Sequence, residues 1–245
     1  MNAGELELSC LEIGYGEALF DPLNIRCEGG DITAVLGSNG RGKTSLLHTI
    51  AGVLEPLAGK ITLSGGFGYV PQFFTPHFSY TAFDIVLMGR ARHISLFSLP
   101  SEKDNEAASL AMRRLDISGL ASRPFNTLSG GQRQMVLIAR ALATQSSLLL
   151  LDEPASALDL QNQEIALRLI KELAKNMKMN ILFTTHEPTH ALLAANKTLL
   201  FLPDKKWCFG RTQDILTEDN LSLAYGVKMN LIALKGEVSR KRCLF

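Results

Sequence analysis

The sequence predicts an α/β fold in which a mainly parallel β-sheet core carries an antiparallel β subdomain and an inserted α-helical subdomain. Short apolar runs alternate with segments of helical period along much of the chain, a pattern typical of a parallel sheet covered by helices. An early segment alternates polar and apolar residues instead, and a middle segment has helical periodicity almost throughout. We therefore expect a strand-rich start, a helical insertion and a return to the parallel core.

Four apolar runs predict the core strands, because strands buried on both faces read as continuous apolar segments. These runs are Ile32 to Leu36, Leu148 to Leu151, Ile181 to Thr184 and Thr198 to Leu202. Two further segments, Lys43 to Ala51 and Gln161 to Lys175, place apolar residues one helical turn apart. They predict helices that pack on the sheet.

The early and middle segments complete the predicted fold. Leu6 to Ile13 and Lys60 to Leu63 alternate as antiparallel strands with one solvated face do. Thr81 to Leu142 is helical in period. Because no internal repeat, low-complexity stretch or linker divides the chain, we expect one domain over residues 1–245, with the helical subdomain at about 74–142.

Charge and composition exclude some classes of protein. The chain of 245 residues has 25 basic and 24 acidic residues and a formal charge of +1, so nothing favours nucleic acid as a partner. No apolar run approaches the roughly 18 residues that span a bilayer. The first residues lack the basic start and the apolar stretch of a secretory signal, which favours the cytoplasm.

The four cysteines indicate neither a zinc site nor a disulfide framework. They are scattered along the chain without a C-x-x-C pair. We expect all four to be reduced thiols: Cys10, Cys27, Cys208 and Cys243.

A phosphate-binding loop is predicted between the strand that ends at Leu36 and the helix that begins at Lys43. The pattern there is G-x-x-x-x-G-K-[ST]. Glycines let backbone N–H groups approach phosphate oxygens, and the helix N-terminus adds a favourable dipole. Lys43 offers a positive charge to the β- and γ-phosphates, and Thr44 offers a hydroxyl to Mg²⁺. We expect a nucleotide to contact Gly37, Ser38, Asn39, Gly40, Arg41, Gly42, Lys43, Thr44 and Ser45.

Two carboxylates and a histidine follow neighbouring core strands. Asp152 and Glu153 come directly after the run that ends at Leu151, at the edge where α/β sheets place their ligands. We expect Asp152 to hold Mg²⁺ and Glu153 to polarise the water that attacks the γ-phosphate. His186 lies just beyond the next predicted strand, where its imidazole can hydrogen-bond the γ-phosphate and steady that water.

A second phosphate-binding helix start is predicted at Leu128 to Gln132, which we call the LSGGQ segment. Ser129 is the expected N-cap of the helix that follows. Because the phosphate loop already serves one nucleotide, a second anion-binding helix start indicates a nucleotide shared between two subunits. We expect that nucleotide to contact Ser129, Gly130, Gly131 and Gln132.

Together these motifs resemble the ATP-binding cassette of ABC transporters. The likeness covers about Leu6 to Leu202, and the motifs occur in the order of the family. They are the phosphate loop, Gln72 in Tyr69-Val-Pro-Gln72, the LSGGQ segment, Leu148 to Pro154, Ser156 to Asp159, and His186. The resemblance implies a P-loop NTPase core, ATP and Mg²⁺ as cofactors, and ATP hydrolysis coupled to transport.

The resemblance also implies roles for particular residues. Gln72 would touch the metal and sense the membrane partner. Ser129 and Gly131 would contact the γ-phosphate bound by the opposite subunit of a homodimer, and Asp159 would bridge the two sites. Tyr15 matches the aromatic residue that stacks on adenine in such cassettes, although an aromatic side chain in an edge strand can also serve packing alone.

Partners and substrate follow from the same resemblance. It implies separate transmembrane permease subunits, a periplasmic or extracellular solute-binding protein that acts indirectly, and a peripheral position on the cytoplasmic face of the cell (inner) membrane. Phe83 to Arg90, with His93 and Phe97, resembles the cassettes of metal-chelate importers for iron-siderophore, haem, cobalamin or molybdate. The short link from Gly59 to Tyr69 is more similar to molybdate or zinc types. The substrate stays open.

Aromatic residues crowd the segment from Gln72 to Phe97. Such side chains are favoured at protein interfaces, so we expect some of them to dock a membrane partner. The alternative is a local core between the helical insertion and the sheet. The residues are Phe73, Phe74, Phe78, Tyr80, Phe83 and Phe97.

Two other functions stay open. One is a soluble ABC ATPase of the iron–sulfur assembly type, not coupled to transport. DNA-repair ATPases need long heptad arms, which the chain lacks, and translation factors carry two cassettes, whereas each motif occurs once here. The other is a regulatory module that binds ATP without hydrolysing it. The presence of Lys43, Asp152, Glu153 and His186 argues against that module.

Overall fold

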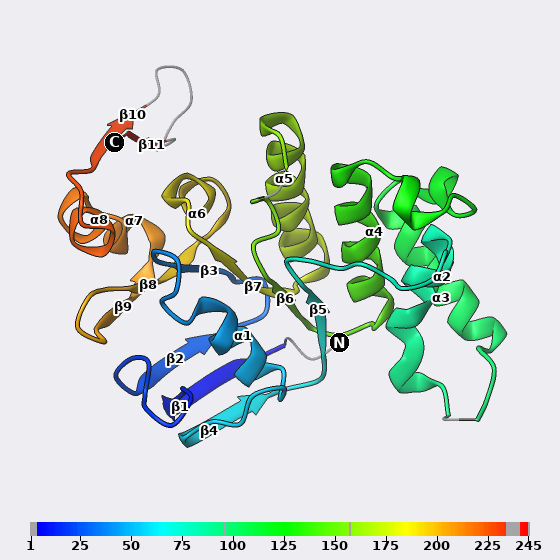
Figure 1. Cartoon of the computed structure of the whole chain (residues 1–245), viewed down its shortest axis with the longest axis horizontal. Coiled ribbons are helices and arrows are strands. Elements are labelled where there is room, and N and C mark those ends of the chain that lie inside the picture. Colours follow the sequence, from blue (N-terminus) through cyan, green and yellow to red (C-terminus); the bar gives the residue numbers. More distant parts are fainter. Residues whose placement is uncertain (1–3, 96, 157, 234–240, 245) are drawn as a thin grey trace.

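The centre of the molecule is a six-stranded sheet with the strand order β5-β6-β7-β3-β8-β9 (Figure 1). The computed structural model describes residues 4–95, 97–156, 158–233 and 241–244. All pairs in this sheet are parallel except β8 with β9. The strands are β3 (Ile32–Leu36), β5 (Phe67–Val70), β6 (Leu148–Leu151), β7 (Asn180–Thr185), β8 (Lys197–Phe201) and β9 (Trp207–Arg211).

The predicted parallel core is confirmed. Every residue of β3, β6 and β7 is buried, as expected for strands covered on both faces. The predicted bounds agree with the observed ones to within a residue at each end. The edge strands β5 and β9 were not predicted, because no continuous apolar run marks them.

The predicted antiparallel subdomain is a separate three-stranded sheet with the order β2-β1-β4. Its strands are β1 (Leu6–Glu12), β2 (Leu23–Cys27) and β4 (Ala58–Leu63). The register of β1 shifts between Leu8 and Leu11, where Cys10 has a positive φ of 46°. The bulge explains why the alternation of β1 is not continuous.

Helices cover both faces of the central sheet. Alternate residues of the strands point to opposite faces and belong to two separate hydrophobic clusters. On one face, α1 (Lys43–Ile50) lies between the two sheets (Figure 1) and packs in a cluster that includes Leu148 and Leu150. Leu149 and Leu151 face the other cluster. The elements that contribute to that second cluster include α5 (Leu160–Met177), α6 (Pro188–Ala194), α7 (Thr212–Ile215) and α8 (Glu218–Tyr225).

The helical region stands beside the β5 edge of the sheet (Figure 1). Thr81 to Leu142 is less continuously helical than predicted, because Pro100 and Pro124 stand in the connections and Thr81, Ser101 and Ser129 each start a new helix with a capping box. Its elements are α2 (Ala82–Leu87), α3 (Glu102–Arg114), α4 (Gly130–Ala143), and 3₁₀ turns at Met88–His93, Ser118–Leu120 and Phe125–Thr127. The division into one domain with a helical subdomain at about 74–142 stays a prediction.

The C-terminal part ends in a hairpin of β10 (Asn230–Ala233) and β11 (Lys241–Leu244). Cys10, Cys27 and Cys208 are free thiols, and the side chain of Cys243 lies outside the described residues. Across the described ranges, no helix has both the length and the apolar character needed to cross a membrane.

Candidate nucleotide-binding site

The phosphate loop joins β3 to α1 in a conformation that needs glycine. Gly42 caps α1 with φ at 85°, and a Cβ there would lie 2.9 Å from the Leu19 side chain. With the loop so held, the Nζ atom of Lys43 donates to the carbonyl oxygens of Gly37 at 2.8 Å and Ser38 at 3.1 Å. The lysine thus points back into the loop where phosphates would lie.

Lys43 is a buried cation close to two carboxylates. Burial lowers the pKa of its ammonium group, and the negative charges of Glu153 and Asp152 oppose that shift. The Nζ atom lies 4.0 Å from Glu153 Oε1. Its hydrogen bonds go to loop carbonyl oxygens, which are weaker partners than an anion, so a phosphate can replace them.

Asp152 lies at the end of β6 with only 3% of its surface exposed. Its Oδ1 atom accepts hydrogen bonds from Thr44 Oγ1 at 3.2 Å and from Thr184 Oγ1 at 2.6 Å. The hydroxyl of Thr44 and the carboxylate of Asp152 are the hard oxygen ligands that Mg²⁺ prefers. Within the described ranges no cluster of three or more His, Cys, Asp or Glu could hold a metal. The Thr44 hydroxyl and the Asp152 carboxylate could supply two oxygen ligands to Mg²⁺.

Glu153 is the point where three other predicted residues meet. Its Oε2 atom accepts from Gln72 Nε2 at 3.2 Å and lies 3.1 Å from His186 Nδ1, while Lys43 faces Oε1. The side chain is 11% exposed, and its backbone has a positive φ of 47°. Residues far apart in the sequence thus converge on one carboxylate at the edge of the site.

These groups border a cavity of about 670 Å³. Gly37, Ser38 and Arg41 belong to the loop without lining this cavity, and Arg41 Nε donates to Ser38 Oγ at 3.3 Å. The predicted residues that line it are Tyr15, Asn39, Gly40, Gly42, Lys43, Thr44, Ser45, Gln72, Glu153 and His186. The Tyr15 ring is 73% exposed, which leaves it available to stack on a ligand and disfavours simple packing.

The LSGGQ segment lies elsewhere on the molecule. Ser129 caps α4 and forms a reciprocal capping box with Gln132. Ser129, Gly131 and Gln132 line a separate hollow of about 280 Å³ together with Asn162 of α5. Asp159 caps α5, and its pKa is lowered by the backbone and side-chain hydrogen bonds from Asn162. No residue lines both hollows.

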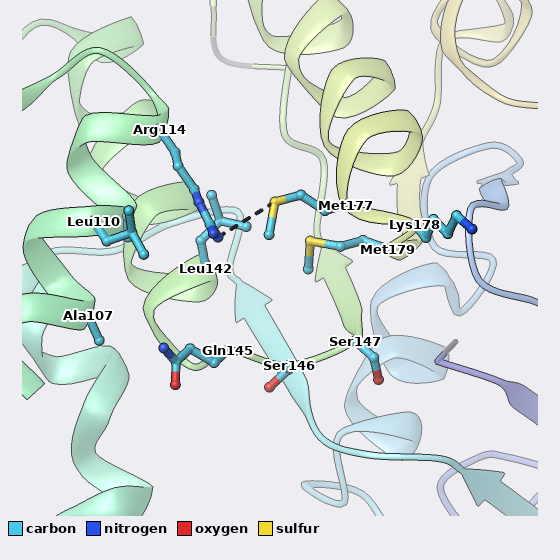
Figure 2. A pocket seen from close by; sticks show the side chains of 11 residues that line it. Ala107, Leu110, Arg114, Leu142, Gln145, Ser146, Ser147, Met177, Lys178 and Met179 are labelled. Atoms are coloured by element: carbon cyan, nitrogen blue, oxygen red, sulfur yellow. Dashed lines mark hydrogen bonds between the residues drawn. The ribbon is translucent and has the colours of Figure 1, made fainter. Parts of the chain in front are cut away.

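Another cavity, of about 100 Å³, lies at the opposite ends of the strands (Figure 2). It is bordered by α3 and by the ends of α4 and α5, just before β6 and β7 begin. The Arg114 guanidinium points toward Met177 there, with 3.9 Å between Nη1 and Sδ. It contains none of the predicted site residues and is much smaller than the phosphate-loop cavity.

Several contacts around the candidate site were not predicted from the sequence. The hydroxyl of Thr184 bonds to both Asp152 and Glu153. Tyr225 of α8 donates its hydroxyl hydrogen to the carbonyl oxygen of His186 at 2.8 Å. That contact joins positions 39 residues apart, so no local pattern could have revealed it. His190 is buried and lies 3.1 Å from Thr185 Oγ1 through Nδ1.

A phosphate loop with acidic and histidine side chains at the carboxyl ends of parallel strands defines a P-loop nucleotide hydrolase. The model of the ABC transporter family matches residues 20–156. The molybdate import ATP-binding protein MolC of Haemophilus influenzae is 48% identical over 211 residues, which cover 86% of this chain and 83% of that protein. The chain belongs to the ABC transporter family, and it is an ATP-binding, ATP-hydrolysing member of it.

Two further similarities support this assignment. A Helicobacter pylori protein described as an iron chelatin transport ATP-binding protein is 37% identical over 244 residues, 93% of this chain and 95% of that protein. A solved structure, assigned to the metal-chelate type of ABC transporter in an inward-facing conformation, matches with a TM-score of 0.94 and 44% identity. That match covers 100% of this chain and 97% of the other.

Proposed function

We propose that this chain powers an ABC importer of a metal chelate or an oxyanion, with molybdate as the first substrate to test. The observation that carries the proposal is the 48% identity to a molybdate import ATP-binding protein over most of both chains. The iron chelatin and metal-chelate relatives support the wider class of iron-siderophore, haem, cobalamin and molybdate systems. Since all three relatives are described as transport proteins, a soluble iron–sulfur assembly ATPase is disfavoured.

The site geometry supports distinct roles for individual residues in ATP binding and hydrolysis. The backbone of the phosphate loop and Lys43 would bind the phosphates of ATP, and Tyr15 would stack on adenine. Thr44, Asp152 and Gln72 would hold Mg²⁺, which neutralises charge on the phosphates. Each of these groups lines the cavity or contacts one that does.

Glu153 is the proposed general base. Its carboxylate is held between Gln72 and His186, so it can accept a proton from a water aligned with the γ-phosphate. His186 would steady that water, and the ammonium of Lys43 would offset the charge that develops on the phosphoryl group.

A composite site formed by two copies of the chain accounts for the second hollow. Ser129 and Gly131 border a surface hollow that is separate from the phosphate-loop cavity of the same chain. The exposed N-terminus of α4 has N–H groups suited to an anion. We therefore assign Ser129, Gly130, Gly131 and Gln132 to the γ-phosphate held by the opposite subunit, with Asp159 between the two sites of the homodimer.

A docking surface for a membrane permease is supported by three aromatic residues. Phe73, Phe78 and Phe97 are exposed by 76%, 72% and 98%, and Phe73 also lines the nucleotide cavity next to Gln72. The remaining aromatic residues of the segment, Phe74, Tyr80 and Phe83, pack against the core. The local-core alternative thus holds for half of the group, and the exposed half is available to a partner on the cytoplasmic face of the membrane.

Reconstitution tests the proposal. The chain would be assembled in vesicles with a candidate permease and solute-binding protein, and ATP-dependent uptake of molybdate, a ferric chelate and cobalamin would be compared. Uptake of one of these above a Lys43→Ala control is expected. Transport of a sugar or an amino acid with none of the three would refute the substrate class, and failure to copurify with a permease would favour the soluble ATPase.

A further inference from the structure

The hydroxyl of Thr184 lies between the two carboxylates of the hydrolytic site. Thr184 is on β7, and the parallel register pairs Leu151 of β6 with Phe183. One step further along both strands, Asp152 therefore stands beside Thr184. The side chain of Thr184 is completely buried, so its hydroxyl has no access to water and must bond within the protein.

The Thr184 hydroxyl is both a hydrogen-bond donor and a hydrogen-bond acceptor to residues of the candidate site. It donates to Asp152 Oδ1 at 2.6 Å and accepts from the backbone N–H of Glu153 at 2.8 Å. Asp152 Oδ1 also accepts from Thr44 of the phosphate loop. The Thr184 Oγ1 atom thus contacts both Asp152, the proposed metal ligand, and the backbone of Glu153, the proposed base. Through Asp152 it is also connected to the phosphate loop.

The Glu153 contact matters because the backbone of Glu153 is strained. A φ of 47° is unusual for a residue other than glycine, and such a conformation persists only when neighbouring groups hold it. Thr184 holds the amide side of the residue, and Ser156 donates its hydroxyl hydrogen to the Glu153 carbonyl oxygen at 3.1 Å on the other side. With the main chain so fixed, the carboxylate is aimed at His186 and Gln72.

We propose that Thr184 is a positioning residue for ATP hydrolysis, which sets the proposed metal ligand Asp152 and the proposed base Glu153 in a fixed relation to each other. The assignment rests on the proposed roles of these two carboxylates and adds a completely buried residue that contacts both of them. Loss of a group that orients a metal ligand typically lowers metal affinity or activity by about tenfold to a hundredfold.

The test uses Thr184→Val, which keeps the branched shape and removes the hydroxyl, and Thr184→Ser, which restores it. Thr198→Val is the matched control, because Thr198 is also a completely buried strand threonine, and its hydroxyl contacts Thr212 at 3.0 Å. Each purified full-length variant would be measured for ATP turnover, for thermal stability, and for affinity for a fluorescent ATP analogue with Mg²⁺ and with EDTA.

In the Thr184→Val variant, turnover should fall by about tenfold to a hundredfold. The gain in nucleotide affinity that Mg²⁺ provides should shrink by a similar factor. The affinity of this variant in EDTA should stay near wild type, because the phosphate loop and Lys43 supply that binding. Thr184→Ser should recover most of both losses, and Thr198→Val should show neither.

Equal losses in Thr184→Val and Thr198→Val, or no recovery in Thr184→Ser, would overturn the proposal and leave only a structural role. Unchanged turnover and unchanged Mg²⁺ dependence in Thr184→Val would overturn it as well. If the wild-type chain binds nucleotide without hydrolysing it, the proposed function fails, and the Mg²⁺ dependence of binding still decides the role of Thr184.

Discussion

Glu153→Gln should separate nucleotide binding from hydrolysis with little disturbance of the site, if Glu153 is the base proposed above. The amide has the shape of the carboxylate, so it can keep hydrogen bonds to Gln72 and His186, which now lie at 3.2 and 3.1 Å. It cannot accept a proton from water at neutral pH. It also removes a negative charge 4.0 Å from Lys43, which should leave phosphate binding intact or stronger.

The magnitude follows from the role of a general base. Loss of such a group costs about 10²- to 10⁴-fold in rate, which raises the activation free energy by roughly 3–5 kcal/mol. Because the side chain is only 11% exposed and is held on both sides, we expect turnover to fall by at least about a hundredfold. The affinity for ATP should change much less than the rate.

Steady-state phosphate release and equilibrium binding of a fluorescent ATP analogue would measure these two quantities. Light scattering coupled to size exclusion would also show whether the variant changes from monomer to dimer when ATP and Mg²⁺ are added, since each trapped nucleotide stabilises the interface. Near-wild-type turnover would refute the role of Glu153. A monomer at saturating ATP with Mg²⁺ would refute the composite site.

Four further outcomes are expected. Lys43→Ala should weaken ATP binding in a filter assay, since it removes the cation that meets the phosphates. Ser129→Phe should abolish the ATP-dependent dimer in size exclusion while the monomer still binds ATP. Phe78→Ala combined with Phe97→Ala should keep that dimer and lose reconstituted transport. Burial lowers the pKa of His190, so protonation of this side chain favours the unfolded chain. The thermal unfolding temperature should therefore fall as pH drops below about 6.5. His190→Gln should make that fall smaller.

The core of the fold was predictable because its strands are short apolar runs that end in polar residues. The β6 run of four leucines and the all-buried β7 carry that signal plainly. The edge strand β9 does not, since its residues are half-buried and include a glycine. Its pairing with β8 depends on tertiary contacts that periodicity does not report.

The position of the candidate site could be predicted where a motif is local, and its contacts could not be predicted where they join separate elements. The phosphate loop reads directly from the spacing of Gly37, Gly42, Lys43 and Thr44. Thr184 was visible only as the last residue of the predicted strand Ile181 to Thr184, because its contacts with Asp152 and Glu153 depend on the register of β7 against β6. The aromatic cluster divided into exposed and packed halves for a similar reason: composition does not say which side of a turn faces the core.

The positive φ of Glu153 also bears on how this position can change during evolution. A non-glycine residue in that conformation costs about 1–3 kcal/mol, so Glu153→Gly should relieve strain and can make the chain more stable. Glycine would also loosen the unfolded chain, which offsets part of that gain. Selection for folding alone would therefore tolerate glycine at position 153, at the expense of the proposed base. Where glutamate is retained there, the proposed role in hydrolysis supplies a reason that stability alone does not.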